Sequence, residues 1–86
     1  MTHWRELIEY EMVRHKEAWR DVLSSTFVIG KEMVQFDNGW GTTCGDPFTV
    51  WTEKRVYFPV QYDGSEWCSS VSRNPDNIAC EHVGGS

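Results

Sequence analysis

The chain has 86 residues, enough for one domain with a single modest core, and 40% of them are hydrophobic. Thirteen acidic residues against eight Lys and Arg give a formal net charge of −5. Proteins that bind duplex nucleic acid need a basic surface, so we expect no such partner. No apolar run approaches the roughly 18 residues of a membrane span, and the charged start THWRE lacks the pattern of a signal peptide. We therefore expect a cytoplasmic protein with no membrane partner.

Residues 3–23 contain neither Gly nor Pro and have the hydrophobic period of a helix. Their apolar side chains recur on one face, at Trp4, Leu7, Ile8, Met12, Ala18, Trp19, Val22 and Leu23. The opposite face is charged, and Arg5 and Glu9 are spaced to pair on it. The pattern predicts one long amphipathic helix. A shorter second helix is predicted over residues 30–37.

Beyond a glycine-rich loop at residues 38–47, the hydrophobic period changes to two. This period predicts three antiparallel strands, at residues 48–52, 55–62 and 65–71. A two-residue turn at Asp63 and Gly64 sets the register of the last two strands, and it places Val60 opposite Trp67. The predicted fold class is α+β, with the helix laid across a three-stranded meander in a single domain.

Both faces of the meander carry apolar side chains. We expect the helix to cover Trp51, Val56, Phe58, Val60, Tyr62, Trp67 and Val71. The other face then shows Phe48, Val50, Tyr57, Pro59 and Cys68, rimmed by Arg55, Gln61 and Glu66. An exposed cluster of this kind is typical of a protein-binding patch. An alternative of equal weight is that the loop at 38–47 folds over this face with Trp40 and makes a second small core.

The predicted binding residues are therefore Tyr57, Phe48, Val50, Pro59, Trp40 and Arg55. A catalytic alternative rests on Glu11 and His15, which lie four residues apart within the apolar face of the predicted helix. A carboxylate beside an imidazole can serve as the acid–base pair of a hydrolase-type enzyme. A satisfied pair at the edge of the helix–sheet interface is the more frequent arrangement, because the sequence places no nucleophile beside them.

Cys44, Cys68, Cys80 and His82 supply the atom types of a zinc site. Structural zinc ligands normally come in close pairs, and here only Cys80 and His82 are close, with one residue between them. Cys68 also falls in mid-strand, opposite Pro59. An odd number of cysteines without a C-x-x-C motif favours free thiols, so we expect no cofactor and keep a small metal-binding protein as an alternative.

The stretch FTVWTEKRVYFPVQYDGSEWCSSVSRNP, followed by EHVGG, resembles a family of short hypothetical proteins encoded by bacteriophages and prophages. The similarity includes EYEM and WRDVLSST earlier in the chain. It transfers no catalytic or binding residue. The resemblance implies a context in which small acidic proteins often bind a host protein, such as a defence complex or part of the transcription machinery. We therefore predict a non-catalytic protein-binding module in the bacterial cytoplasm, acting as an inhibitor or modulator of a host complex.

Two further hypotheses follow from the acidity and the size of the chain. A surface that mimics DNA needs carboxylates without interrupting cations, and the predicted helix carries Arg5, Arg14, Lys16 and Arg20 among its acids. That hypothesis is therefore weak. A self-associating structural component is the other hypothesis, and the sequence leaves the oligomeric state open.

Overall fold

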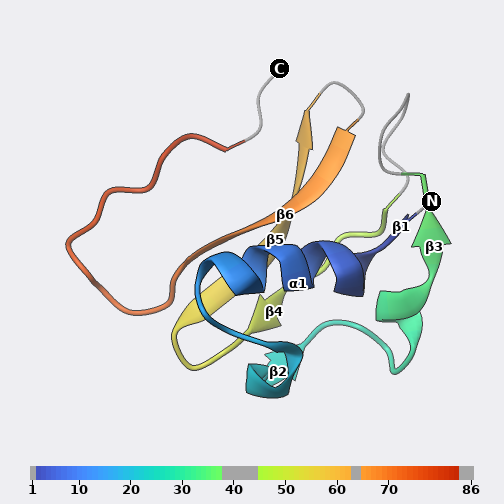
Figure 1. Ribbon diagram of the computed structural model, residues 1–86, viewed down its shortest axis with the longest axis horizontal. Coiled ribbons are helices and arrows are strands. Elements are labelled where there is room, and N and C mark those ends of the chain that lie inside the picture. Colours follow the sequence, from blue (N-terminus) through green and yellow to red (C-terminus); the bar gives the residue numbers. More distant parts are fainter. Residues whose placement is uncertain (1, 38–44, 63–64, 84–86) are drawn as a thin grey trace.

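The computed structural model describes residues 2–37, 45–62 and 65–83 (Figure 1). In chain order its elements are β1 (Thr2–His3), α1 (Trp4–Arg14), a 3-10 turn η1 (Trp19–Asp21), β2 (Ser24–Ser25), a second 3-10 turn η2 (Lys31–Met33), β3 (Gln35–Phe36), β4 (Val50–Trp51), β5 (Arg55–Tyr62) and β6 (Ser65–Ser72). The strands β2, β4, β5 and β6 form an antiparallel sheet in that order, and β1 pairs separately with β3. The α+β class is confirmed, because α1 packs on this sheet. No helix in the described ranges is long and apolar enough to cross a membrane.

The predicted register of the long hairpin is confirmed. Val60 lies opposite Trp67 in the pairing of β5 with β6, and the ladder continues unbroken from Tyr62 and Ser65 to Arg55 and Ser72. The antiparallel pairing of β4 with β5 is also confirmed. A turn closed by the Thr52 N–H on the Arg55 carbonyl, at 3.0 Å, joins these two strands. The sheet is larger than the predicted meander, because β2 adds a fourth strand beside β4.

The helix ends much earlier than predicted. It stops at Arg14, and the Glu17 N–H then donates to the Met12 carbonyl at 2.9 Å, while the Lys16 N–H donates to Val13. These two bonds are a Schellman motif, whose left-handed position is usually filled by Gly. Here Lys16 fills it, with a φ of 60°. The prediction of one helix over 3–23 is therefore wrong, since the chain reverses at Lys16 and runs on to the sheet.

The predicted second helix over 30–37 is also wrong. Lys31 donates its N–H to the Val28 carbonyl, closing a tight turn in which Gly30 has a φ of 89°. Only one 3-10 turn follows, and the chain then becomes extended as β3 beside β1. The physical reason is tertiary pairing, which places the Phe36 ring 4.8 Å from the Trp4 ring and seals one end of the core.

The helix covers the opposite face of the sheet from the one predicted. The buried cluster joins α1 to the sheet through Trp4, Ile8, Met12, Phe48, Val50, Tyr57 and Cys68. The physical reason lies in the polar groups that become buried with this interface. The Glu11 and Glu17 carboxylates need donors there, and they receive them from Ser70, Tyr57 and Thr52. The Tyr57 face supplies these hydroxyl groups, so it becomes the inner face.

Candidate functional site

The face of the sheet away from α1 carries a set of apolar side chains, which we call the outer face. Its residues are Trp51, Val56, Phe58, Val60, Trp67 and Val71. Val60 is buried among its neighbours, and the other five are partly exposed. At the end of β5, on the same face, the side chain of Tyr62 is 47% exposed. A sheet face with two tryptophans and a phenylalanine in contact with solvent is an apolar surface larger than scattered single residues.

The predicted binding residues fall mostly in the interior. Phe48, Val50 and Tyr57 are core residues, so the prediction that they form an exposed patch is wrong. Pro59 and Arg55 are partly exposed. Arg55 is held at the helix–sheet interface, where its Nε donates to Ser70 Oγ at 2.8 Å. Trp40, with most of the loop once expected to cover this face, lies outside the described residues.

Glu11 is the centre of a buried polar network under α1. Its carboxylate is 5% exposed and receives bonds from Arg14 at 3.1 Å and from Ser70 Oγ at 2.8 Å. His15 Nε2 lies 3.0 Å from the second Glu11 oxygen. The predicted contact of Glu11 with His15 is thus present, and the network ties the last turn of α1 to β6.

The bonds of this network hold α1 against the sheet, and they do not match the geometry of a catalytic site. The Ser70 hydroxyl accepts from Arg55 and donates to Glu11, so both of its roles in the network are occupied within the protein. His15 and the Ser70 hydroxyl both contact Glu11 and not each other, so the three residues do not form the serine–histidine–carboxylate order that activates a nucleophile. The catalytic role of Glu11 and His15 stays an untested alternative.

Glu17 forms a second link between the turn after α1 and the sheet. One carboxylate oxygen accepts the Tyr57 hydroxyl at 2.6 Å and the Thr52 hydroxyl at 3.0 Å. Burial, which has the larger effect, and the hydrogen bond to Glu17 both raise the pKa of Tyr57 far above its ordinary value of 10.0. Tyr57 therefore serves as a protonated donor throughout the physiological range.

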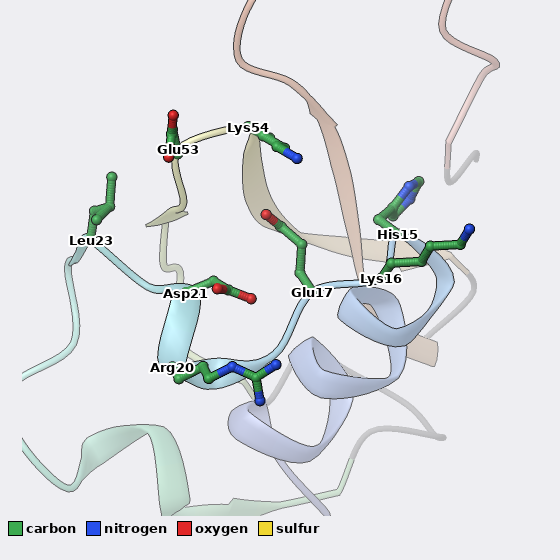
Figure 2. Close-up of a pocket in the computed structure, with 8 residues that line it drawn as sticks. All are labelled: His15, Lys16, Glu17, Arg20, Asp21, Leu23, Glu53 and Lys54. Carbon is green, nitrogen blue, oxygen red and sulfur yellow. The ribbon is translucent and has the colours of Figure 1, made fainter.

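A charged cleft of about 530 Å³ opens beside Glu17. It is lined by His15, Lys16, Glu17, Arg20, Asp21, Leu23, Glu53 and Lys54. Figure 2 shows Glu17 near its centre, Glu53 and Lys54 on the facing turn, and Lys16 and Leu23 pointing away. Both cations and carboxylates line the opening, and Figure 2 shows that their polar atoms do not converge on one point. The cleft therefore has neither the single sign of charge nor the convergent geometry of a built binding site.

The cysteine and histidine set is spread over separate parts of the fold. Cys68 is buried in the core. Its burial, which has the larger effect, and the nearby Glu11 both raise the pKa of its thiol well above 9.0. Cys80 and His82 are exposed on the C-terminal segment, and Cys44 lies outside the described residues. Among the residues that the structure describes, no three His, Cys, Asp or Glu side chains are close enough to hold a metal ion.

A second exposed apolar surface lies in the loop between β2 and β3. Ile29 is 101% exposed at the tip of the tight turn, and three more apolar side chains near it, Val28, Met33 and Val34, are also exposed. This surface was not predicted from the sequence, where Met33 and Val34 were assigned to a helix over residues 30–37 and Val28 and Ile29 to no element. Gly30, which takes a positive φ in this turn, is the signal that could have indicated it.

No family model, curated protein or solved structure matches the chain. A functional proposal therefore rests on the geometry described above and on the resemblance in the sequence.

Proposed function

We propose that this protein is a non-catalytic module that binds another protein through the outer face of its sheet. The observation that carries the proposal is the partly exposed row of Phe58, Trp67 and Val71 on the two strands of the long hairpin, which pair without interruption from Arg55 to Tyr62. Tryptophan and other aromatic side chains supply much of the energy of protein interfaces because they bury a large area at little cost in conformational entropy. Exposed clusters of this kind mark interaction sites on small monomers.

The position of the outer face supports a binding role over a structural one. α1 already covers the inner face and completes a core there, with Tyr57 and Ile8 fully buried. The outer aromatic residues are therefore not needed to bury the helix. Their strands are anchored from the other side by the Glu11 and Glu17 networks, which hold the outer face in one arrangement.

The resemblance to short phage and prophage proteins directs the search for the partner to the bacterial cytoplasm. In that context the module would act as an inhibitor or modulator of a host defence or nucleic-acid-handling complex, through contact with a protein and not with duplex nucleic acid. The acidic charge of −5 is consistent with this choice, because it disfavours direct contact with phosphates. The small metal-binding or hydrolase-type alternative is supported by no described constellation beyond the Glu11–His15 contact.

The test is affinity capture from bacterial lysate at increasing lysate concentration, with the double variant Phe58→Gln and Trp67→Gln as comparison. Glutamine removes the apolar area from the outer face and leaves the inner core intact. Val13→Gln is the matched control, because Val13 is 74% exposed on the helix layer. We expect one saturable partner that the wild type and the control retain and the double variant loses. A partner held equally by all three proteins, or no saturable partner, contradicts the proposal.

A further inference from the structure

The free edge of β6 is a second surface, distinct from the outer face that binds the partner. β6 is the last strand of the sheet and, among the described strands, pairs with β5 alone. It runs for eight residues, SEWCSSVS, without Lys, Pro or an interruption of its register. Lysine, proline, bulges and short length are the usual means by which proteins protect an edge strand from pairing with another chain. β6 has none of these, and its one charged residue, Glu66, points inward near the start of the strand, so residues 67–72 of the edge carry no charge.

The described part of the chain leaves this edge accessible. A groove of about 1000 Å³ runs beside β6, between Arg14 and His15 on one side and the C-terminal residues 73–83 on the other. Those C-terminal residues are all exposed, and Figure 1 shows their segment sweeping away from the sheet in a wide arc. Trp67, Ser69 and Val71 of β6 line the groove themselves, so an approaching strand would enter it between α1 and the C-terminal segment.

We propose that two copies of this chain pair antiparallel along β6 about a twofold axis at Ser69. An antiparallel pair related by a twofold axis perpendicular to the sheet places one residue opposite its own copy. With Ser69 in that place, residues 66–72 of the two copies overlap completely. Trp67 of each copy then lies opposite Val71 of the other, which is a favourable pairing of an aromatic with a β-branched side chain.

The charges on β6 are compatible with this self-pairing. Glu66 is the only ionisable carboxylate of the strand; it is buried on the inner face and lies opposite Ser72 of the second copy. No like charges therefore meet along the edge, although the chain as a whole has a net charge of −5. The small serine side chains at the axis allow the two backbones to approach to ladder distance.

The paired sheets would be continuous, with eight strands. Directly opposed residues of an antiparallel pair lie on the same side of the sheet, so the two outer faces join into one surface around Trp67 and Val71. The pairing thus extends the proposed binding face, but it does not depend on which protein that face binds. Self-association and partner binding are separate measurements.

A register-specific cross-link tests the proposal. In a Cys44→Ser and Cys80→Ser background, Ser69→Cys places two thiols opposite each other, where Cα atoms are about 4.5–5.5 Å apart and a disulfide is allowed. Ser72→Cys is the control, because its two copies would be about 20 Å apart in this register. We expect the background protein to have twice its mass of 10.0 kDa in solution and only Ser69→Cys to form a disulfide-linked dimer on oxidation.

A charge variant provides a second, independent measurement. Ser69→Lys would place two ammonium groups against each other across the axis and should weaken dimerisation at least tenfold, with an unchanged circular dichroism spectrum. Ser24→Lys, on the exposed opposite edge strand β2, should leave the dimer intact. A monomer at every concentration, or cross-linking of Ser72→Cys as efficient as that of Ser69→Cys, overturns the proposal. A monomeric chain whose β6 edge pairs instead with a segment of another protein overturns it equally.

Discussion

The Tyr57 hydroxyl donates a 2.6 Å hydrogen bond to the Glu17 carboxylate, which joins the middle of the sheet to the turn that ends α1. Tyr57 is fully buried, and Glu17 reaches it only because the chain reverses at Lys16. The same carboxylate oxygen accepts the Thr52 hydroxyl, which also accepts the Arg55 N–H in the turn between β4 and β5. One contact therefore couples the end of the helix to the geometry of the sheet.

Removing the Tyr57 hydroxyl should destabilise the protein without changing its fold. Tyr57→Phe keeps the ring in the core and deletes a hydrogen bond to a carboxylate, so we expect the free energy of unfolding to fall by about 1.5–3 kcal/mol. Urea denaturation measures this change. The control is Tyr62→Phe at the exposed end of β5, which should change the free energy by no more than about 0.5 kcal/mol. Equal effects of the two substitutions would contradict the assignment of Tyr57 to the core.

Stability should fall in alkaline solution. The pKa values of Tyr57 and Cys68 are raised above their ordinary 10.0 and 9.0, so the folded chain keeps two protons that the unfolded chain releases. The unfolded state then binds fewer protons, and the free energy of unfolding decreases as pH rises past about 9, by up to about 1.4 kcal/mol per pH unit for each group. Below that pH the contribution is fully present.

Above about pH 10, the free energy of unfolding should decrease less steeply with pH in Tyr57→Phe than in the wild type, because that variant has no phenol to ionise at this position. Urea denaturation at a series of alkaline pH values provides the comparison. A slope that is the same in the variant and the wild type would show that Tyr57 does not resist ionisation in the folded state.

The buried Glu11 network predicts a contrast within one helix. Glu11→Ala leaves the Ser70 hydroxyl without its acceptor at the helix–sheet interface, removes the ion-pair partner of Arg14, and should lower the free energy of unfolding by about 3 kcal/mol. Glu9→Ala breaks only the exposed pair with Arg5, at 3.2 Å, and should lower it by less than about 0.5 kcal/mol. Thermal or urea denaturation of both variants tests the contrast, and a small effect at Glu11 would contradict the network.

Lys16 should be replaceable by glycine with a gain in stability. Its φ of 60° lies in the left-handed region, which strains a residue that has a Cβ atom and suits glycine. We expect Lys16→Gly to raise the free energy of unfolding by about 0.5–1 kcal/mol. Lys31→Gly, in the 3-10 turn η2, should produce no gain. Destabilisation by Lys16→Gly would mean that the Schellman motif is not what ends the helix.

The register of β5 and β6 could be predicted because the turn at Asp63 and Gly64 and the alternation of apolar side chains impose the same pairing. The end of α1 could not be predicted from these signals. The left-handed residue that ends the helix is Lys16, and the sequence signals for such a position are Gly and Asn. Residues 17–23 also keep a helix-like apolar pattern, which in the structure serves packing against the core at Trp19 and Val22.

The choice of inner face could not be predicted either, and the candidate site depends on it. Apolar side chains recur at every second position on both faces of the sheet. Hydrophobic content alone would favour burial of the face with Phe58 and Trp67. The side with Tyr57 is buried because it satisfies two carboxylates, Glu11 and Glu17, that come from outside the sheet. That requirement becomes visible only when the helix and its turn are placed against the strands.

Photo-crosslinking in bacteria tests the central claim most directly, namely that the outer face binds a protein. A photoreactive amino acid is placed at Phe58 on the outer face or, as control, at Val13 on the helix layer. We predict one discrete adduct from position 58, heavier than two copies of this chain, that position 13 does not form and that Trp67→Gln abolishes. No such adduct from position 58, or an equal one from position 13, would contradict the account.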